Sequence, residues 1–378
     1  MSFSQSSALK CASAVLAAAI LGCGPRDGVK EFEQGKAAYE LKDLKKAETL
    51  FARSVVLAPQ DADRILYLAR TELELGELAE AQLQIAKAFT IAGDDADVRL
   101  LKAQIDWHAK NYEDAAKGFT EVAEDIRLEA SVRAQGWAGL GVVEMTCDNH
   151  HLARVAFLRA IRLDRRNAAA WYHLGLLYRD GFGYLEAALE QFEIFVRLEE
   201  EASPRVQKVQ RTIIPALKEQ ISRAAMERPG VAKRNSSVAA TSIATAESAL
   251  KKGNVKAARE AYQQALAADP LSYPAALGLA KAWEKTDATK AGQQKAFEAY
   301  KSACALSPSA VSTFLTTGSL AVKLGYSSQA VEIYSRAVAA NPTSYDAIDG
   351  LIRVLRRGGK ADKVTNAYQA YRNSLGKK

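Results

Sequence analysis

One eleven-residue stretch, AAAWYHLGLLY at positions 168–178, constrains the fold of this chain more than any other segment. It places large apolar or small residues at relative positions i, i+3, i+4 and i+7, which share one face of an α-helix: Trp171, Leu174, Gly175 and Tyr178. Ala188 and Phe192 follow at a spacing of four, and the glycine permits close packing of two helices. A single helix pair cannot bury such a face, so the pattern predicts stacked copies of the pair.

Copies of this pattern recur along the chain. The small residue of the second helix falls at nine positions: Ala47, Ala81, Ala115, Ala153, Ala188, Ala258, Ala296, Ala330 and, as a departure, Val364. Four of the eight intervals in this series are 34 residues, and the other four are informative. The longer interval before Ala153 predicts an insertion near 126–130, and the interval before Ala188 predicts one extra residue in the turn at 179–183.

The spacing resembles the tetratricopeptide repeat (TPR), a helix–turn–helix unit of about 34 residues with W-x2-L-G-x2-Y and A-x3-F positions. The resemblance covers nearly all of residues 28–374 and implies an all-α fold, a TPR helical-repeat solenoid wound as a right-handed superhelix. We predict about nine repeats in two arrays joined by a long helix and linker. The expected domains are a signal peptide (1–22), an acylated cysteine with a short tether (23–27), array one with five repeats (28–201), the long helix and linker (202–238) and array two with four repeats, the last a cap (239–378).

The segment between the two arrays does not resemble a repeat. Ser203 and Pro204 are a capping residue and a first-turn proline, which are typical of a helix start. Apolar residues then recur at helical spacing as far as Ala225, which predicts one long amphipathic helix with a kink at Pro215. Residues 227–237, ERPGVAKRNSS, are rich in helix breakers and predict a linker.

The amino-terminal segment has the character of a leader. Residues 11–22 form an apolar run that suits a signal-peptide core and is too short for a permanent membrane-spanning helix. The run ends in Ile-Leu-Gly-Cys at positions 20–23, which resembles the bacterial lipobox. That resemblance implies that Cys23 is acylated (for example with palmitate) and anchors the chain, because two or three acyl chains bind a membrane stably. The alternative is an ordinary secretory signal that contains a cysteine. Gly24, in place of Asp, implies sorting to the outer membrane.

Charge is distributed unevenly along the chain. Residues 24–200 carry 23 Lys and Arg against 31 Asp and Glu, whereas residues 201–378 carry 27 against 13. The amino-terminal half is therefore acidic and the carboxy-terminal half basic, which biases the partners that approach each half. The alternative is that these are solvated faces that merely differ in sign.

Catalytic and metal-binding motifs are not evident. The cysteines show no C-x-x-C pair, and there is no phosphate-binding glycine loop, H-E-x-x-H or G-x-S-x-G motif. Cys147, His150 and His151 cluster in a predicted turn, TCDNHH, but a structural zinc site needs a fourth ligand and none is evident nearby. We therefore predict no enzyme, no cofactor and no metal site.

Array two carries cations at or near helix positions that face the groove of such an array. These are Lys251, Lys281, Lys285, Lys323, Arg353, Arg356 and Arg357. Trp107 is a further candidate for contact in array one. The helix positions that grip a terminal carboxylate in one variant of the family carry no Lys/Asn pair here, which argues against that type of clamp.

These observations together predict a membrane-anchored, non-catalytic scaffold or adaptor for protein–protein interactions. Its location would be the bacterial cell envelope, lipid-anchored in the outer membrane and facing the periplasm. Its partners would be envelope proteins or peptides of acidic character, and nucleic acid is not expected outside the cytoplasm. The alternative is a binding protein for an anionic glycan or lipid, held in the same basic groove.

Overall fold

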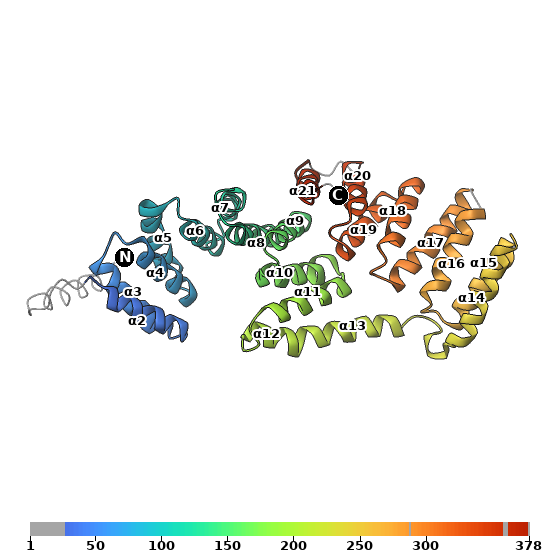
Figure 1. Ribbon diagram of the computed structural model, residues 1–378, viewed down its shortest axis with the longest axis horizontal. Coiled ribbons are helices and arrows are strands. Elements are labelled where there is room, and N and C mark those ends of the chain that lie inside the picture. The colour runs from blue at the N-terminus through green and yellow to red at the C-terminus, as the bar shows by residue number, and fades with distance from the viewer. Residues whose placement is uncertain (1–26, 287–288, 358–361, 377–378) are drawn as a thin grey trace, which may run out of the picture. The chain divides into compact units, whose positions relative to one another are not determined.

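The computed structural model describes residues 27–286, 289–357 and 362–376. Every regular element in these ranges is a helix, and no strand occurs among them (Figure 1). The predicted signal peptide and Cys23 lie outside the described residues. None of the described helices combines the length and the apolar character needed to cross a bilayer.

The described helices divide into two compact units, one ending at Leu128 and one beginning at Glu129. We call the first helix of each pair its A helix and the second its B helix. Unit 1 contains three pairs: α2 (Val29–Glu40) with α3 (Leu44–Leu57), α4 (Ala62–Leu75) with α5 (Leu78–Ala92), and α6 (Ala96–His108) with α7 (Tyr112–Glu124).

Unit 2 contains six further pairs and a connecting segment. Two pairs precede the connection: α8 (Ala130–Thr146) with α9 (His150–Leu163), and α10 (Ala168–Leu176), extended by the π-helix η1 (Leu177–Phe182), with α11 (Leu185–Leu198). The connection comprises α12 (Pro204–Lys208), the π-helix η2 (Val209–Ile213), α13 (Ile214–Met226) and the short η3 (Val231–Lys233). Four pairs follow: α14 (Ser236–Lys251) with α15 (Val255–Ala268), α16 (Tyr273–Thr286) with α17 (Lys290–Leu306), α18 (Val311–Leu324) with α19 (Ser327–Ala340), and α20 (Tyr345–Arg357) with α21 (Asp362–Ser374).

The predicted fold class, an all-α helical-repeat solenoid, is confirmed for the described residues. The predicted arrays, 28–201 and 239–378, were defined by repeat spacing and stay a prediction. The compact units are defined by packing and divide after Leu128. The unit boundary coincides with the insertion predicted near 126–130, which lies in the connection between α7 and α8.

Within a pair, the glycine of the A helix faces the aromatic ring of the B helix. A Cβ atom added to Gly141 would lie 2.5 Å from the Phe157 ring, and one added to Gly175 would lie 3.0 Å from the Phe192 ring. Both rings are fully buried. The glycine therefore makes room for the ring against the A-helix backbone, which refines the packing role predicted for Gly175.

Two π-helical turns accommodate irregularities of the sequence. The extra residue predicted at 179–183 falls in η1, where a wider turn absorbs one residue without breaking the helix. The second turn, η2, ends just before Pro215, whose missing N–H cannot continue a regular α-helical ladder. The long helix predicted between the arrays is thus an α–π–α succession from Pro204 to Met226.

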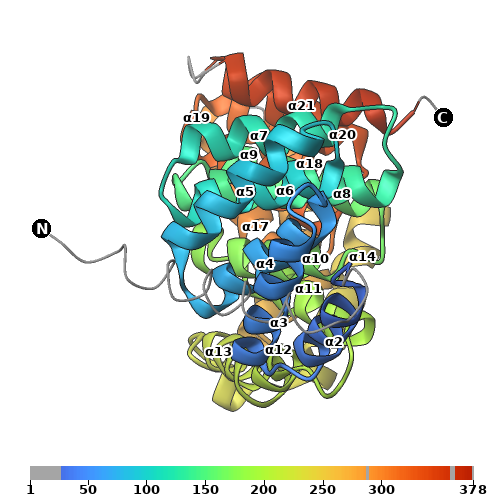
Figure 2. The same cartoon turned by 90° about the vertical axis from the view of Figure 1, so that its left-hand side faces the viewer.

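The last helix of unit 2 returns to the beginning of that unit. In Figures 1 and 2, α21 lies beside α9, and side chains of the two helices are hydrogen-bonded. One hydrophobic cluster continues from α9, through the connecting helices, to α21, and its large fully buried members include Phe157, Tyr178, Phe297 and Tyr368. Unit 2 therefore has a common core that joins repeats remote in sequence.

Candidate interaction surfaces

Seven cations form a row along the A helices of the last four pairs, which we call the cation row. Its members are Lys251 on α14, Lys281 and Lys285 on α16, Lys323 on α18, and Arg353, Arg356 and Arg357 on α20. All seven side chains are exposed. None makes an ion pair with a carboxylate whose side chain the structure describes, so with respect to those carboxylates their charge is open to a partner.

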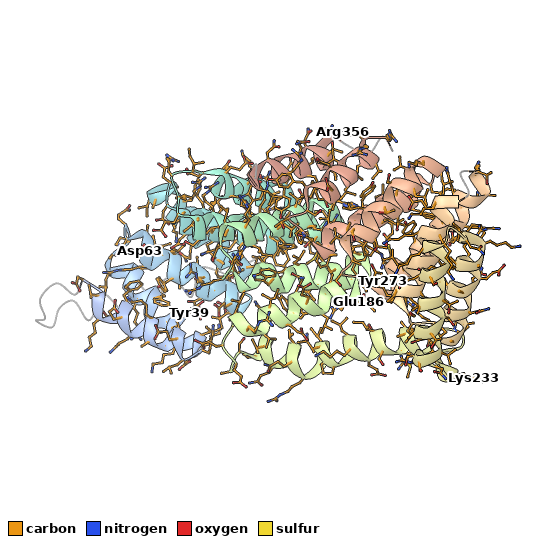
Figure 3. All side chains as sticks on the ribbon, turned by 45° about the vertical axis from the view of Figure 1, so that its right-hand side comes forward. Tyr39, Asp63, Glu186, Lys233, Tyr273 and Arg356 are labelled. Atoms are coloured by element: carbon orange, nitrogen blue, oxygen red, sulfur yellow. The ribbon has the colours of Figure 1, made fainter. Side chains whose placement is uncertain are left out.

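The repeat geometry explains where the cation row lies. Lys251, Lys285, Lys323 and the Arg356–Arg357 pair occupy the last turns of their helices. A cation in the last turn also interacts favourably with the helix macrodipole, which gives these residues a structural role as well. The row therefore follows the edge where each A helix meets the turn to its B helix, and Arg356 lies at the outer edge of the view in Figure 3.

Lys281 and Arg353 lie one turn before these helix ends. Each is four residues from a second cation, Lys285 and Arg357 respectively, so each pair shares one helix face. The favourable effect of the macrodipole fades beyond the last turn, and like charges at this spacing destabilise a helix slightly. These two residues are therefore the members of the row with the weakest structural reason to be basic.

Trp107 does not belong to the cation row. It lies on α6 in unit 1, is half-buried, and packs edge-on against His108 with ring centroids 4.7 Å apart. Burial lowers the pKa of His108. Trp107 thus forms an aromatic pair with His108 in unit 1, the unit that does not contain the cation row.

Cys147, His150 and His151 do not lie together in one turn. The turn comprises only residues 147–149, and both histidines belong to the first turn of α9. His150 packs against the Phe182 ring, whereas the Nδ1 atom of His151 lies 3.1 Å from the Tyr368 hydroxyl. Within the described ranges, no group of three or more His, Cys, Asp or Glu side chains is placed to hold a metal ion.

Sequence reasoning missed a buried arginine that holds unit 2 together. Arg154 on α9 is fully buried. Its Nε donates to the Tyr368 hydroxyl of α21 at 2.7 Å, and its Nη1 donates to the Ser335 carbonyl of α19 at 3.0 Å. Its guanidinium also lies 4.7 Å from the centre of the Phe182 ring. No carboxylate of the described residues pairs with this cation, so neutral acceptors and ring faces stabilise it.

Local sequence carries little sign of this role. Arg154 follows the repeat alanine Ala153, at a position where other repeats carry residues as different as Glu48, Phe297 and Val331. Its partners lie 181 and 214 residues further along the chain. The same return of the chain also creates a pocket between α11 and the α18–α19 pair, which no sequence pattern indicated.

Comparison with known proteins agrees with the helix pairing. Residues 243–311 match the family model of the tetratricopeptide repeat. The matched TPR segment spans α15, α16 and α17 and extends into the helix on either side. A search of curated proteins matched nothing.

Several solved structures are similar to the chain. PilF of Pseudomonas aeruginosa is 18% identical, covers 53% of this chain and 93% of its own, and superposes with a TM-score of 0.41. PilW, described as a widely conserved type IV pilus biogenesis factor, is 15% identical over 66% of this chain and 97% of its own, with a TM-score of 0.40. MamA of Desulfovibrio magneticus RS-1 is 15% identical, covers 47% of this chain and 98% of its own, and has a TM-score of 0.38. With TM-scores below 0.5, these likenesses carry no conclusion about what this chain binds.

Proposed function

We propose that this chain is a scaffold for protein–protein interactions, anchored by lipid at Cys23 in the bacterial cell envelope. The cation row is the contact surface of the proposal, and its partner is an envelope protein or peptide with an acidic segment. The proposal assigns no catalysis to the chain. The outer membrane, facing the periplasm, is the location that the lipobox-like sequence and Gly24 favour.

The observation that carries the proposal is the recurrence of exposed cations on four successive A helices. Exposed lysines without an ion pair to a described residue also occur outside the row, such as Lys110 and Lys117, so the row is distinguished by its alignment on successive A helices. Cations on four successive A helices can meet acidic groups on one extended partner, and such complementarity raises association rates and selects partners.

Affinity co-purification from gently solubilised envelopes tests the proposal. One bait is the native protein, and a second carries Lys281→Glu, Lys323→Glu and Arg353→Glu. A matched control carries Lys256→Glu, Lys290→Glu and Lys301→Glu, which reverse three exposed charges on the B helices α15 and α17.

We expect a protein that is recovered with the native bait and the control bait and is lost with the cation-row bait. Equal recovery with all three baits would refute the assignment of the surface. Recovery of no protein, together with salt-sensitive binding of purified anionic glycan or lipid that the cation-row substitutions abolish, would favour the alternative function.

The anchor is tested separately. Cells fed an alkyne analogue of palmitate should incorporate the label into the native protein and not into Cys23→Ser, and the variant should leave the membrane fraction. Label incorporation that survives Cys23→Ser would refute the anchor and leave the scaffold proposal standing.

A further inference from the structure

A pocket of about 270 Å³ lies between α11 and the α18–α19 pair of unit 2. Its lining includes Tyr184, which caps α11, Ala187 of α11, Phe314 of α18, and Ala339 and Ala340 of α19. Tyr184 and Phe314 are themselves almost fully buried, so the apolar lining is held by the core. The volume is just below the range of about 300–1,000 Å³ that is usual for small-molecule sites, and it suits a single large side chain.

Two carboxylates stand at this pocket. Glu186 and Glu190 are one turn apart on α11, both line the pocket, and both are exposed. Neither has an ion pair or hydrogen bond with a described residue. Glu186 lies in the first turn, where the helix dipole favours an acid, but Glu190 lies beyond that turn. Figure 3 labels Glu186 on α11.

Arg336 of α19, the one cation among the described lining residues, is already neutralised. Arg336 of α19 lies with its Nε atom 2.7 Å from the Glu332 carboxylate and its guanidinium 4.8 Å from the Tyr184 ring centre. The Tyr184 hydroxyl donates to the same Glu332 carboxylate at 3.2 Å. On the α19 side of the pocket, Arg336 and Glu332 therefore neutralise each other. On the α11 side, the carboxylates of Glu186 and Glu190 have no such partner among the described residues.

We propose that this pocket binds an arginine side chain of a protein partner. The methylene stem would lie against Ala187, Ala339 and Ala340, and the guanidinium would reach Glu186 and Glu190. Long cationic side chains bury their stems on apolar surface while the charged head stays hydrated. Arginine suits the two carboxylates better than lysine, because its planar fork makes parallel hydrogen bonds with fixed geometry.

The inference rests on the proposed scaffold role but uses a different surface of opposite charge. The cation row selects acidic segments, whereas this pocket selects a basic residue. A partner that engages both would therefore carry charges of both signs in a defined order, and each contact can fail without the other.

The probe for this pocket is a fluorescein-labelled heptapeptide library with a fixed central arginine and flanking positions drawn from Ala, Leu, Ser and Gly. A matched library carries citrulline, the neutral analogue of arginine, at the centre. Both are applied to the immobilised full-length protein at low salt, and retained fluorescence is compared. We expect about tenfold more retention of the arginine library, as two exposed charged contacts allow.

Three variants decide the assignment. Glu186→Gln with Glu190→Gln should abolish the preference for arginine, whereas Glu247→Gln with Glu260→Gln, which neutralises two exposed glutamates on α14 and α15, should preserve it. Ser309→Trp places a bulky side chain at an exposed lining position and should block retention with both carboxylates intact. Equal retention of the two libraries, or a preference that survives loss of Glu186 and Glu190, overturns the proposal.

Discussion

Glu72 of α4 is a buried carboxyl whose ionisation should control the stability of unit 1. Its side chain is only 5% exposed, and its Oε2 atom has no hydrogen-bond partner among the described residues. Its pKa is raised from 4.5 to about 7, mainly by burial and then by the nearby carboxylates of Glu48, Glu77 and Glu80, whereas a hydrogen bond with Gln84 lowers it. Between pH 4.5 and about 7, the folded state therefore holds a proton that the unfolded state has released.

The sign of the effect follows from this difference. Below pH 4.5, the carboxyl is protonated in both states and costs nothing. Between pH 4.5 and about 7, only the unfolded state ionises, so the free energy of unfolding falls as the pH rises. A tenfold change in an equilibrium corresponds to about 1.4 kcal/mol, so the total loss reaches about 3 kcal/mol above pH 7.

Glu72→Gln should remove this dependence, because an amide cannot ionise and can donate to the neighbouring carboxylates. We expect the variant to match the native protein at pH 4.5 and to exceed its stability by about 3 kcal/mol at pH 8. Hydrogen exchange of peptides from α4 and α5, corrected for intrinsic rates, reports the local opening free energy at each pH. Glu121→Gln, an exposed glutamate on α7 in the same unit, is the control.

The reasoning would be refuted by a Glu72→Gln variant whose exchange keeps the pH dependence of the native protein. Glu80→Gln offers a second check, because it removes one of the charges that raise the pKa of Glu72. It should move the loss of stability to lower pH without abolishing it.

Three further predictions concern unit 2. His173 should make this unit respond to pH in the opposite direction, because burial and the charge of Arg205 lower its pKa to about 4. Between pH 6.5 and 4 the unfolded state binds a proton that the folded state does not, so the free energy of unfolding falls as the pH falls. His173→Phe should abolish this loss of stability, as measured by hydrogen exchange of α10. Arg154→Ala should speed exchange of α21 at least about tenfold, because each buried polar group left without a partner costs about 1–3 kcal/mol, and unchanged exchange would contradict its bridging role. Gly141→Ala should lower the free energy of unfolding by about 1–3 kcal/mol, since its Cβ would lie 2.5 Å from the Phe157 ring, and Phe157→Leu in the same chain should restore part of the loss.

The helix pairs could be predicted from sequence because each depends on contacts within one repeat. Ala188 and Phe192, four residues apart, are both fully buried in α11, as their spacing predicted. Such contacts need only the helical period and a small residue opposite a large one. The order of A and B helices follows from the same signal, so the cations of the row could be assigned to A helices before their environment was known.

The positions of Arg154 and of the pocket at α11 could not be predicted in this way. Both depend on the rotation between each repeat and the one before it, added up over the segment from α9 to α21. The π-helical turns η1 and η2 lie on that path, and small changes there alter which helices finally meet. This total rotation cannot be predicted from the residues of α9 alone.

The last repeat, predicted as a cap, packs on an earlier repeat of unit 2. A terminal repeat needs a polar outer face, because nothing stacks beyond it. Yet α21 presents Tyr368 and Tyr371, which are 0% and 2% exposed, and Tyr368 is hydrogen-bonded to Arg154 of α9. Tyr368 stands four residues after Val364, where most repeats bury an aromatic residue within their own pair, so the hydrogen bond to Arg154, and not the burial, reveals the second contact. That contact is with α9, so the final helix ends the repeat series by docking on an earlier repeat.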